Sequence, residues 1–296
     1  MTSFPRTTVG GLSVSRMIVG TNWFLGFSHC TRAKDNYVIE NVRNRKAMAD
    51  IIEVFLREGV DTIMGLIDVE SFHDAILEAQ DRTGIEAIVI ATPGLPVEGD
   101  TAARGFDIGE VERILDVQAQ KGAAICMPHQ GTTDRMLDRC TRELRHMHTV
   151  CRLIRERGMV PGLSTHIPET IVCADETGLD VETYISIYNA AGFLMQVEVD
   201  WTSRIIQRAK KPVITIKPMA AGQLRPFQAL TFVWNTIRPQ DMVTVGTMSP
   251  EEAAEDIELS RTILEQRQAD FPLQETRSKV TLQPDRGGAA AGSSVK

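Results

Sequence analysis

The stretch MADIIEVFLREGVDTIMGLIDVESFHDAILEAQDRTGIEAIVIA, residues 48–91, decides the fold class. Apolar residues recur at helical spacing from Met48 to Phe55, Gly59 ends that helix, and a strand begins at Val60. The same succession then repeats, with a helix expected over 71–83 and a strand over 87–91. Helices that alternate with short β-rich runs are typical of a parallel sheet built from β-α units.

The alternation extends along most of the chain. The other expected strands cover residues 15–20, 123–127, 160–164, 193–197, 213–216 and 242–245, and the other expected helices cover 108–120, 136–157, 181–190 and 202–209, with further helices opening at Pro226 and after the capping residue Ser249. Eight β-α pairs without a long linker predict one α/β domain over residues 1–267, a TIM-type (β/α)8 barrel. The glycine-rich residues 268–296 are expected to form a flexible tail, and residues 24–44 form an unusually long connection after the first strand.

Composition excludes several classes of protein. The 296 residues include 32 Lys and Arg against 39 Asp and Glu, a net charge of −7, so no basic excess points to nucleic acid. No apolar stretch is long enough to span a membrane, and the amino-terminal residues lack an apolar signal core. The five cysteines form no C-x-x-C pair. We therefore expect a cytoplasmic protein with reduced thiols that binds a small-molecule substrate and that could form a homo-oligomer.

In a TIM-type barrel the active site lies at the carboxyl ends of the strands. The polar or glycine positions expected there include Asn22, Asp68, His129, Ser164, His166, Gln196, Glu198, Lys217 and Gly246. The long first loop adds a polar, cationic segment with His29, Cys30, Arg32 and Lys34, which we interpret either as a lid over an anionic or hydroxyl-rich substrate or as an oligomer contact.

Several of these strand ends resemble those of the aldo-keto reductase superfamily. The resemblance covers most of the chain in outline and rests on LSVSRMIVGTN at 12–22, GLSTHIPETI at 162–171, QVEVDW at 196–201 and, most closely, ITIKPMAAGQL at 214–224 with the segment at 229–258. It implies a barrel that binds NADPH and uses an Asp, Tyr, Lys and His set, and only His129 matches that set cleanly. No tyrosine follows the second strand, Ala91-Thr92-Pro93 replaces the motif with the lysine, and the aspartate could align with Asp61 or Met64.

Two chemistries are open for the remaining groups. His129, His166 and Glu198 have the donor types of a divalent-metal site, although they could equally form ordinary hydrogen bonds at the strand ends. Lys217 follows an apolar run, so burial could lower its pKa and favour a role as electrophilic stabiliser, base or Schiff-base nucleophile. Asp68 is a candidate acid or ligand, but an aspartate before a helix often caps it.

We therefore predict an enzyme that acts on a small polar carbonyl- or sugar-like metabolite by acid-base chemistry, with or without the assistance of a metal, as a lyase or isomerase does. The predicted catalytic residues are His129, Lys217, Glu198 and Asp68. The first alternative is an NAD(P)-dependent oxidoreductase, whose cofactor would contact Asn22, Ser164, Gln196 and Gly246. The second is a non-catalytic barrel that binds a ligand or a protein.

Overall fold

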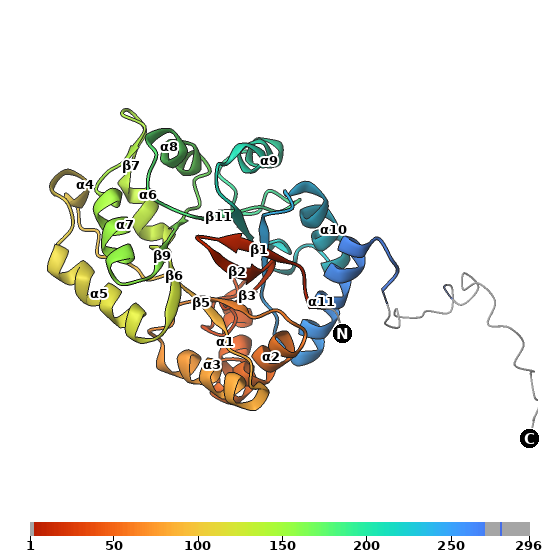
Figure 1. Cartoon of the computed structure of the whole chain (residues 1–296). Coiled ribbons are helices and arrows are strands. Elements are labelled where there is room, and N and C mark those ends of the chain that lie inside the picture. Colours follow the sequence, from red (N-terminus) through yellow and green to blue (C-terminus); the bar gives the residue numbers. More distant parts are fainter. Residues whose placement is uncertain (1–2, 270–278, 280–296) are drawn as a thin grey trace, which may run out of the picture.

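The computed structural model describes residues 3–269 and residue 279, and its core is a nearly closed barrel of parallel strands (Figure 1). The hydrogen-bonded order is β10, β11, β12, β13, β3, β4, β5, β6 and β9. Their bounds are β3 Met17–Gly20, β4 Thr62–Gly65, β5 Ile88–Ala91, β6 Ala123–Cys126, β9 Val160–Pro161, β10 Leu163–Ser164, β11 Tyr184–Ile187, β12 Val213–Ile216 and β13 Met242–Val245. Because β9 and β10 are two pieces of one extended segment around Gly162, the strands complete a TIM-type barrel and confirm the predicted fold class.

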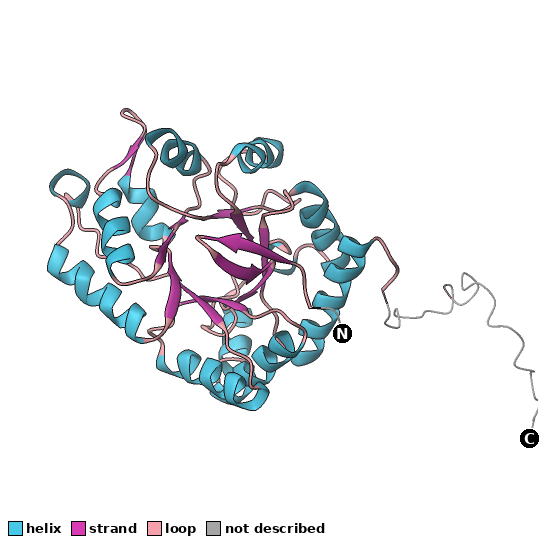
Figure 2. Ribbon diagram, in the orientation of Figure 1, coloured by secondary structure: helices cyan, strands magenta, loops and turns pink. Residues whose placement is uncertain are grey.

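A β-hairpin closes the amino-terminal end of this barrel, as Figure 2 shows. Its strands β1 (Arg6–Val9) and β2 (Leu12–Ser15) pair antiparallel. Val9 and Val14 are buried and pack with barrel side chains that include Ile90, Ile125 and Ile214. The amino-terminal mouth is thus filled with apolar side chains, which leaves the carboxyl ends of the strands as the open end.

Helices surround the barrel and pack their apolar faces against its outer surface (Figure 2). They are α1 Arg32–Asn41, α2 Arg45–Arg57, α3 Glu70–Thr83, α4 Thr101–Arg104, α5 Ile108–Gln120, α6 Gln130–Met136, α7 Met147–Glu156, α8 Glu169–Thr177, α9 Val199–Arg208, α10 Pro226–Thr236 and α11 Pro250–Glu265, with a 3-10 turn η1 over Ala220–Gly222. Among the described residues, no helix combines the length and apolar character needed to cross a membrane.

The predicted sixth strand and the helix before it are wrong. The strand expected over 193–197 is a loop, and the residues expected as helix at 181–190 contain β11 instead. All four residues of β11 are buried, and they pair in parallel register with Val213–Ile216 of β12. A short run rich in isoleucine and buried on both faces has no alternation, so its sequence does not distinguish a strand from a helix.

The predicted long helix at 136–157 is also wrong, because it is interrupted. A small hairpin of β7 (Leu137–Asp138) and β8 (Glu143–Leu144) separates α6 from α7. The Asp138 carboxylate accepts a hydrogen bond of 2.9 Å from the amide of Cys140, and Arg142 has a left-handed φ of 58°. A side-chain-capped turn of this kind competes with the helix for the backbone groups.

The remaining predicted elements lie close to the observed ones. The helix at 108–120 and the strands at 213–216 and 242–245 have the predicted bounds, and Ser249 caps α11 through its hydroxyl, which accepts from the amide of Glu252 at 3.2 Å. The long connection after β3 contains α1. Nearly all of the predicted flexible tail lies outside the described residues.

Candidate active site

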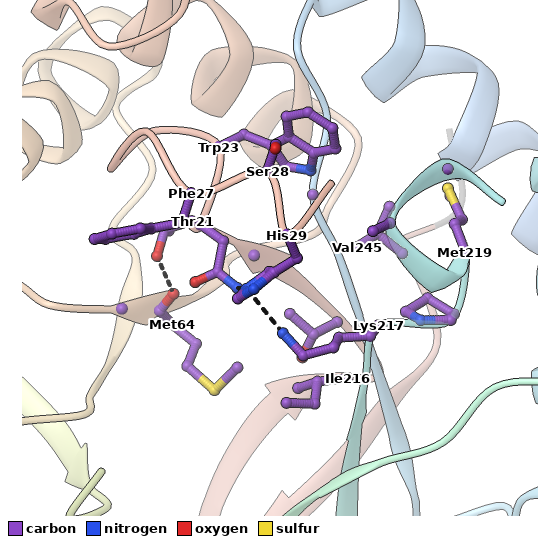
Figure 3. Close-up of a pocket in the computed structure, with 18 of the residues that line it drawn as sticks. Thr21, Trp23, Phe27, Ser28, His29, Met64, Ile216, Lys217, Met219 and Val245 are labelled. Atoms are coloured by element: carbon purple, nitrogen blue, oxygen red, sulfur yellow. Dashed lines mark hydrogen bonds between the residues drawn. The ribbon is translucent and has the colours of Figure 1, made fainter. Parts of the chain in front are cut away.

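A cavity of about 860 Å³ opens at the carboxyl ends of the strands. Its walls come from the ends of β3, β4, β10, β12 and β13, from the loop between β3 and α1, and from α11. Figure 3 shows part of this lining, with the side chains of His29 and Lys217 directed toward each other. The lining also includes His129 and His166, so the three basic residues expected at strand ends all line one cavity.

Lys217 directly follows β12, and its backbone has a left-handed φ of 60°. This conformation is costly for a residue with a side chain, and such strain often occurs at functional positions. Burial lowers the pKa of Lys217 to about 8, because the ammonium loses hydration. Within the described part of the chain, no carboxylate forms an ion pair with Lys217 that would restore its pKa.

His29 comes from the loop between β3 and α1 and contacts the amine directly. Its Nε2 lies 2.9 Å from Nζ of Lys217 and 2.9 Å from Nδ2 of Asn22. An ammonium and an amide nitrogen can only donate, so Nε2 accepts both hydrogen bonds and the ring proton lies on Nδ1. Burial and the positive charge of Lys217 lower the pKa of His29, which favours this neutral form.

His129 and His166 line the same cavity. Nδ1 of His129 accepts a 3.2 Å hydrogen bond from the amide of Gly131, which places the proton of the neutral ring on Nε2. Burial, followed by the charge of Lys217, lowers the pKa of His129. Burial and the nearby basic groups lower the pKa of His166 to about 4. At neutral pH His166 is therefore a neutral imidazole beside an amine.

Asp134 of α6 fixes the backbone that presents His166. Its carboxylate accepts a hydrogen bond from the hydroxyl of Thr165 and a 3.1 Å hydrogen bond from the amide of His166. Burial raises the pKa of Asp134, and the two hydrogen bonds oppose that increase. Asp134 does not line the cavity, so its contribution is to position the β10–α8 connection.

Three of the predicted site residues lie elsewhere. Gln196 and Glu198 are exposed, because the predicted strand that would have carried them into the mouth is a loop, and Glu198 precedes α9 as its cap residue. Asp68 is exposed in the turn before α3 and does not line the cavity. The structure does not bring Glu198 to the cavity that His129 and His166 line, and the described residues contain no cluster of three such side chains that could hold a metal ion.

The three other residues predicted to contact a cofactor, Asn22, Ser164 and Gly246, do line the cavity. Gly246 lies against the indole of Trp23, where an added Cβ would lie 2.6 Å from Cδ1. A side chain at position 246 would therefore clash with a ring of the cavity wall.

The end of the cavity beside α11 is acidic. Glu252, Glu255 and Asp256 line it, and burial together with the two neighbouring glutamates raises the pKa of Asp256 to about 8. The first amides of α11 are partly used, because Ser249 accepts from the amide of Glu252. Carboxylates and occupied amides fit the 2′-phosphate of NADPH poorly.

No tyrosine lines the cavity. Tyr37 is exposed on α1, the hydroxyl of Tyr184 donates to Asp175 at 2.7 Å, and Tyr188 is buried in the core. His29 was expected only as part of a lid or an oligomer contact, and its direct contact with Lys217 was not predicted.

Comparisons with known proteins support the fold class but not a particular activity. No family model and no curated protein matches this sequence. An aldo-keto reductase candidate from Pseudomonas aeruginosa superposes with a TM-score of 0.63 at 16% identity, over 88% of this chain and 95% of that chain. The apo form of Gox0644 gives a TM-score of 0.55 at 9% identity, over 93% of this chain and 97% of that chain. The Amycolatopsis orientalis BexX/CysO complex gives 0.52 at 14% identity, over 93% and 99% of the two chains.

Proposed function

We propose that this protein is an enzyme that acts on a small, polar carbonyl- or sugar-like compound by acid-base chemistry, as a lyase or isomerase does, with Lys217 as the reacting amine. The observation that supports this proposal most strongly is the state of Lys217, a half-buried amine at the cavity wall with a pKa lowered to about 8 and with no carboxylate partner among the described residues. At neutral pH about one tenth of such an amine is uncharged, against about one part in 3,000 for an ordinary lysine.

An uncharged amine can add to a carbonyl carbon and form an imine with loss of water. The protonated imine then draws electrons from the neighbouring carbon, which eases loss of a proton or cleavage of a bond there. His129 and His166 are suited to accept and return that proton, because both are neutral imidazoles in the same cavity. Neither step requires the tyrosine that a reductase of the resembling superfamily would use.

The test is chemical trapping of the imine. The protein is incubated with single small carbonyl compounds, among them pyruvate, glyoxylate, dihydroxyacetone and glyceraldehyde, and is then reduced with borohydride, which converts an imine into a stable amine. We expect at least one compound to add its mass to the peptide that contains Lys217. A Lys217→Arg variant keeps the positive charge but forms no imine, and Lys211→Arg is the matched control, because Lys211 is paired with Glu182 outside the cavity. Adducts spread over surface lysines, or none on Lys217, would contradict the proposal.

An NAD(P)-dependent oxidoreductase is the second candidate function. The observation that favours it is the size of the cavity, since about 860 Å³ reaching from Lys217 to α11 exceeds what a small carbonyl compound fills. Quenching of nicotinamide fluorescence on titration with the protein would support this candidate, and the acidic wall predicts weaker binding of NADPH than of NADH.

A non-catalytic binding barrel would give a different outcome. In that case a ligand would still bind to a His129→Ala, His166→Ala double variant, and no compound would be trapped on Lys217.

A further inference from the structure

The loop between β3 and α1 carries His29 across the mouth of the barrel to the end of β12 (Figure 3). Two contacts hold the loop in this position. Sγ of Cys30 donates a 2.8 Å hydrogen bond to the carbonyl oxygen of Ala221, and the amide of Ser28 donates at 2.8 Å to Asp35 of α1. Ser28 and Cys30 are the residues directly before and after His29, so the backbone of His29 is anchored on both sides.

The backbone of His29 has a left-handed φ of 57°, like that of Lys217 opposite it. His29 and Lys217 thus both adopt the left-handed backbone conformation, which is costly for residues other than glycine, at the point where their side chains contact each other. The contact that results is a 2.9 Å hydrogen bond between Nε2 of His29 and Nζ of Lys217. Among the described residues, His29 is the titratable group that forms a hydrogen bond with this amine.

The geometry of the pair allows a proton to pass directly between the two nitrogens, which lie 2.9 Å apart. The lone pair of Nε2 is available to the ammonium proton of Lys217 at 2.9 Å, and it is shared with the amide of Asn22, which also lies 2.9 Å away. The other groups that act on His29 are Asp35, which lies on α1, and His166, whose ring is neutral at neutral pH. No carboxylate competes for the ammonium within the described residues.

We propose that His29 is a catalytic residue that moves the proton at Nζ of Lys217 during imine formation, an inference that rests on the function proposed above. Neutral His29 takes a proton from the ammonium and leaves a free amine and an imidazolium. The amine forms a bond to the carbonyl carbon, and one nitrogen-bound proton moves to the oxygen, which gives a neutral carbinolamine. The imidazolium returns its proton to the hydroxyl as the C–O bond breaks, so that water leaves, a protonated imine remains and His29 is neutral again.

The experiment measures the first-order rate of borohydride-trappable adduct on Lys217, with whichever carbonyl compound the wild-type protein accepts. His29→Asn and His29→Gly are the informative variants, because Asn and Gly tolerate the left-handed backbone while neither can transfer a proton. We expect both to react about 100-fold more slowly, a typical loss on removal of a general acid-base. We also expect added imidazole to restore the rate of His29→Gly by filling the space that the side chain leaves.

The matched control is His148→Asn on the exposed surface of α7, which should react like the wild type with or without imidazole. Circular dichroism and a urea transition of each variant separate loss of chemistry from loss of the fold. Trapping at the wild-type rate in both His29 variants would overturn the role of His29 while leaving the proposed function intact. A folded His29→Gly protein that is slow and that imidazole does not accelerate would also overturn it. If the wild type itself forms no adduct on Lys217, the proposed function fails instead.

Discussion

The partial burial of Lys217, which lowers the pKa of its amine, also lowers the free energy of unfolding. Burial lowers the pKa of this residue from its ordinary 10.5 to about 8, so the folded protein binds its proton less tightly than the unfolded chain does. Folding therefore costs free energy wherever the ammonium is charged in both states, which is below about pH 8. Between about pH 8 and pH 10.5 the unfolded state keeps the proton that the folded state has lost, and the contribution of Lys217 to stability improves as pH rises.

A Lys217→Met variant should consequently be more stable than the wild type at pH 7, by about 1 to 3 kcal/mol after allowance for partial exposure to solvent. The measurement is the free energy of unfolding in urea at pH 7 and at pH 10, where the difference should shrink. A variant that is less stable at pH 7 would show that the ammonium is well solvated.

Of the residues that line the site, the sequence placed His129, His166 and Lys217 correctly at strand ends, because each follows a strand that its apolar pattern predicts well. It misplaced Glu198 and Gln196, which depended on the wrong sixth strand. His29 was expected in a lid or an oligomer contact, but its contact with Lys217 could not be predicted, since the two residues lie 188 positions apart in the chain. Local pattern determines where a strand ends, whereas the path of a long loop depends on tertiary contacts.

At the scale of elements, α6 and the β10–α8 connection act together through Asp134. Replacing this residue by Ala leaves the amide of His166 without its acceptor, while the hydroxyl of Thr165 can still donate to the carbonyl oxygen of Ile167 at 3.0 Å. We expect a loss of about 2 kcal/mol in the free energy of unfolding and slower trapping on Lys217, because His166 is no longer held. Asp134→Asn keeps one acceptor oxygen and should lose less in both measurements. Equal losses in the two variants would mean that the carboxylate charge, and not its hydrogen bonds, matters.

Elements with a clear period were predictable, and elements without one were not. The helix at 108–120 matches α5 because its apolar positions recur every three to four residues and Asp107 caps it. The hairpin between α6 and α7 was missed because short paired segments of two residues carry no period. Its turn depends instead on the hydrogen bonds that Asp138 accepts.

For the whole molecule, the proposed chemistry requires a closed amino-terminal end and an open carboxyl end of the barrel. The hairpin of β1 and β2 supplies the closure, with Val14 fully buried among the interior side chains of the barrel. Val14→Ala should lower the free energy of unfolding by about 2 kcal/mol through the cavity it creates, and it should leave trapping on Lys217 unchanged. Thr8→Ala, on the exposed face of the hairpin, is the control and should change neither. Loss of trapping in Val14→Ala would indicate that the two ends of the barrel are coupled.

The whole chain has a net charge of −7, yet His29, His129, His166 and Lys217 gather at one side of the cavity and acidic groups gather at the side of α11. Because burial lowers the pKa of Lys217 to about 8, about one tenth of the amine is uncharged at neutral pH. The chemistry proposed for this protein depends on that property.

The most direct test is therefore the titration of Lys217 itself. In protein labelled with 13C-lysine, the Cε resonance of Lys217 can be identified by its absence from a Lys217→Arg variant and followed by NMR from pH 6 to pH 11. We expect a midpoint near pH 8 for this resonance, well below the midpoints of the surface lysines. A midpoint near the ordinary value of 10.5 would contradict this expectation.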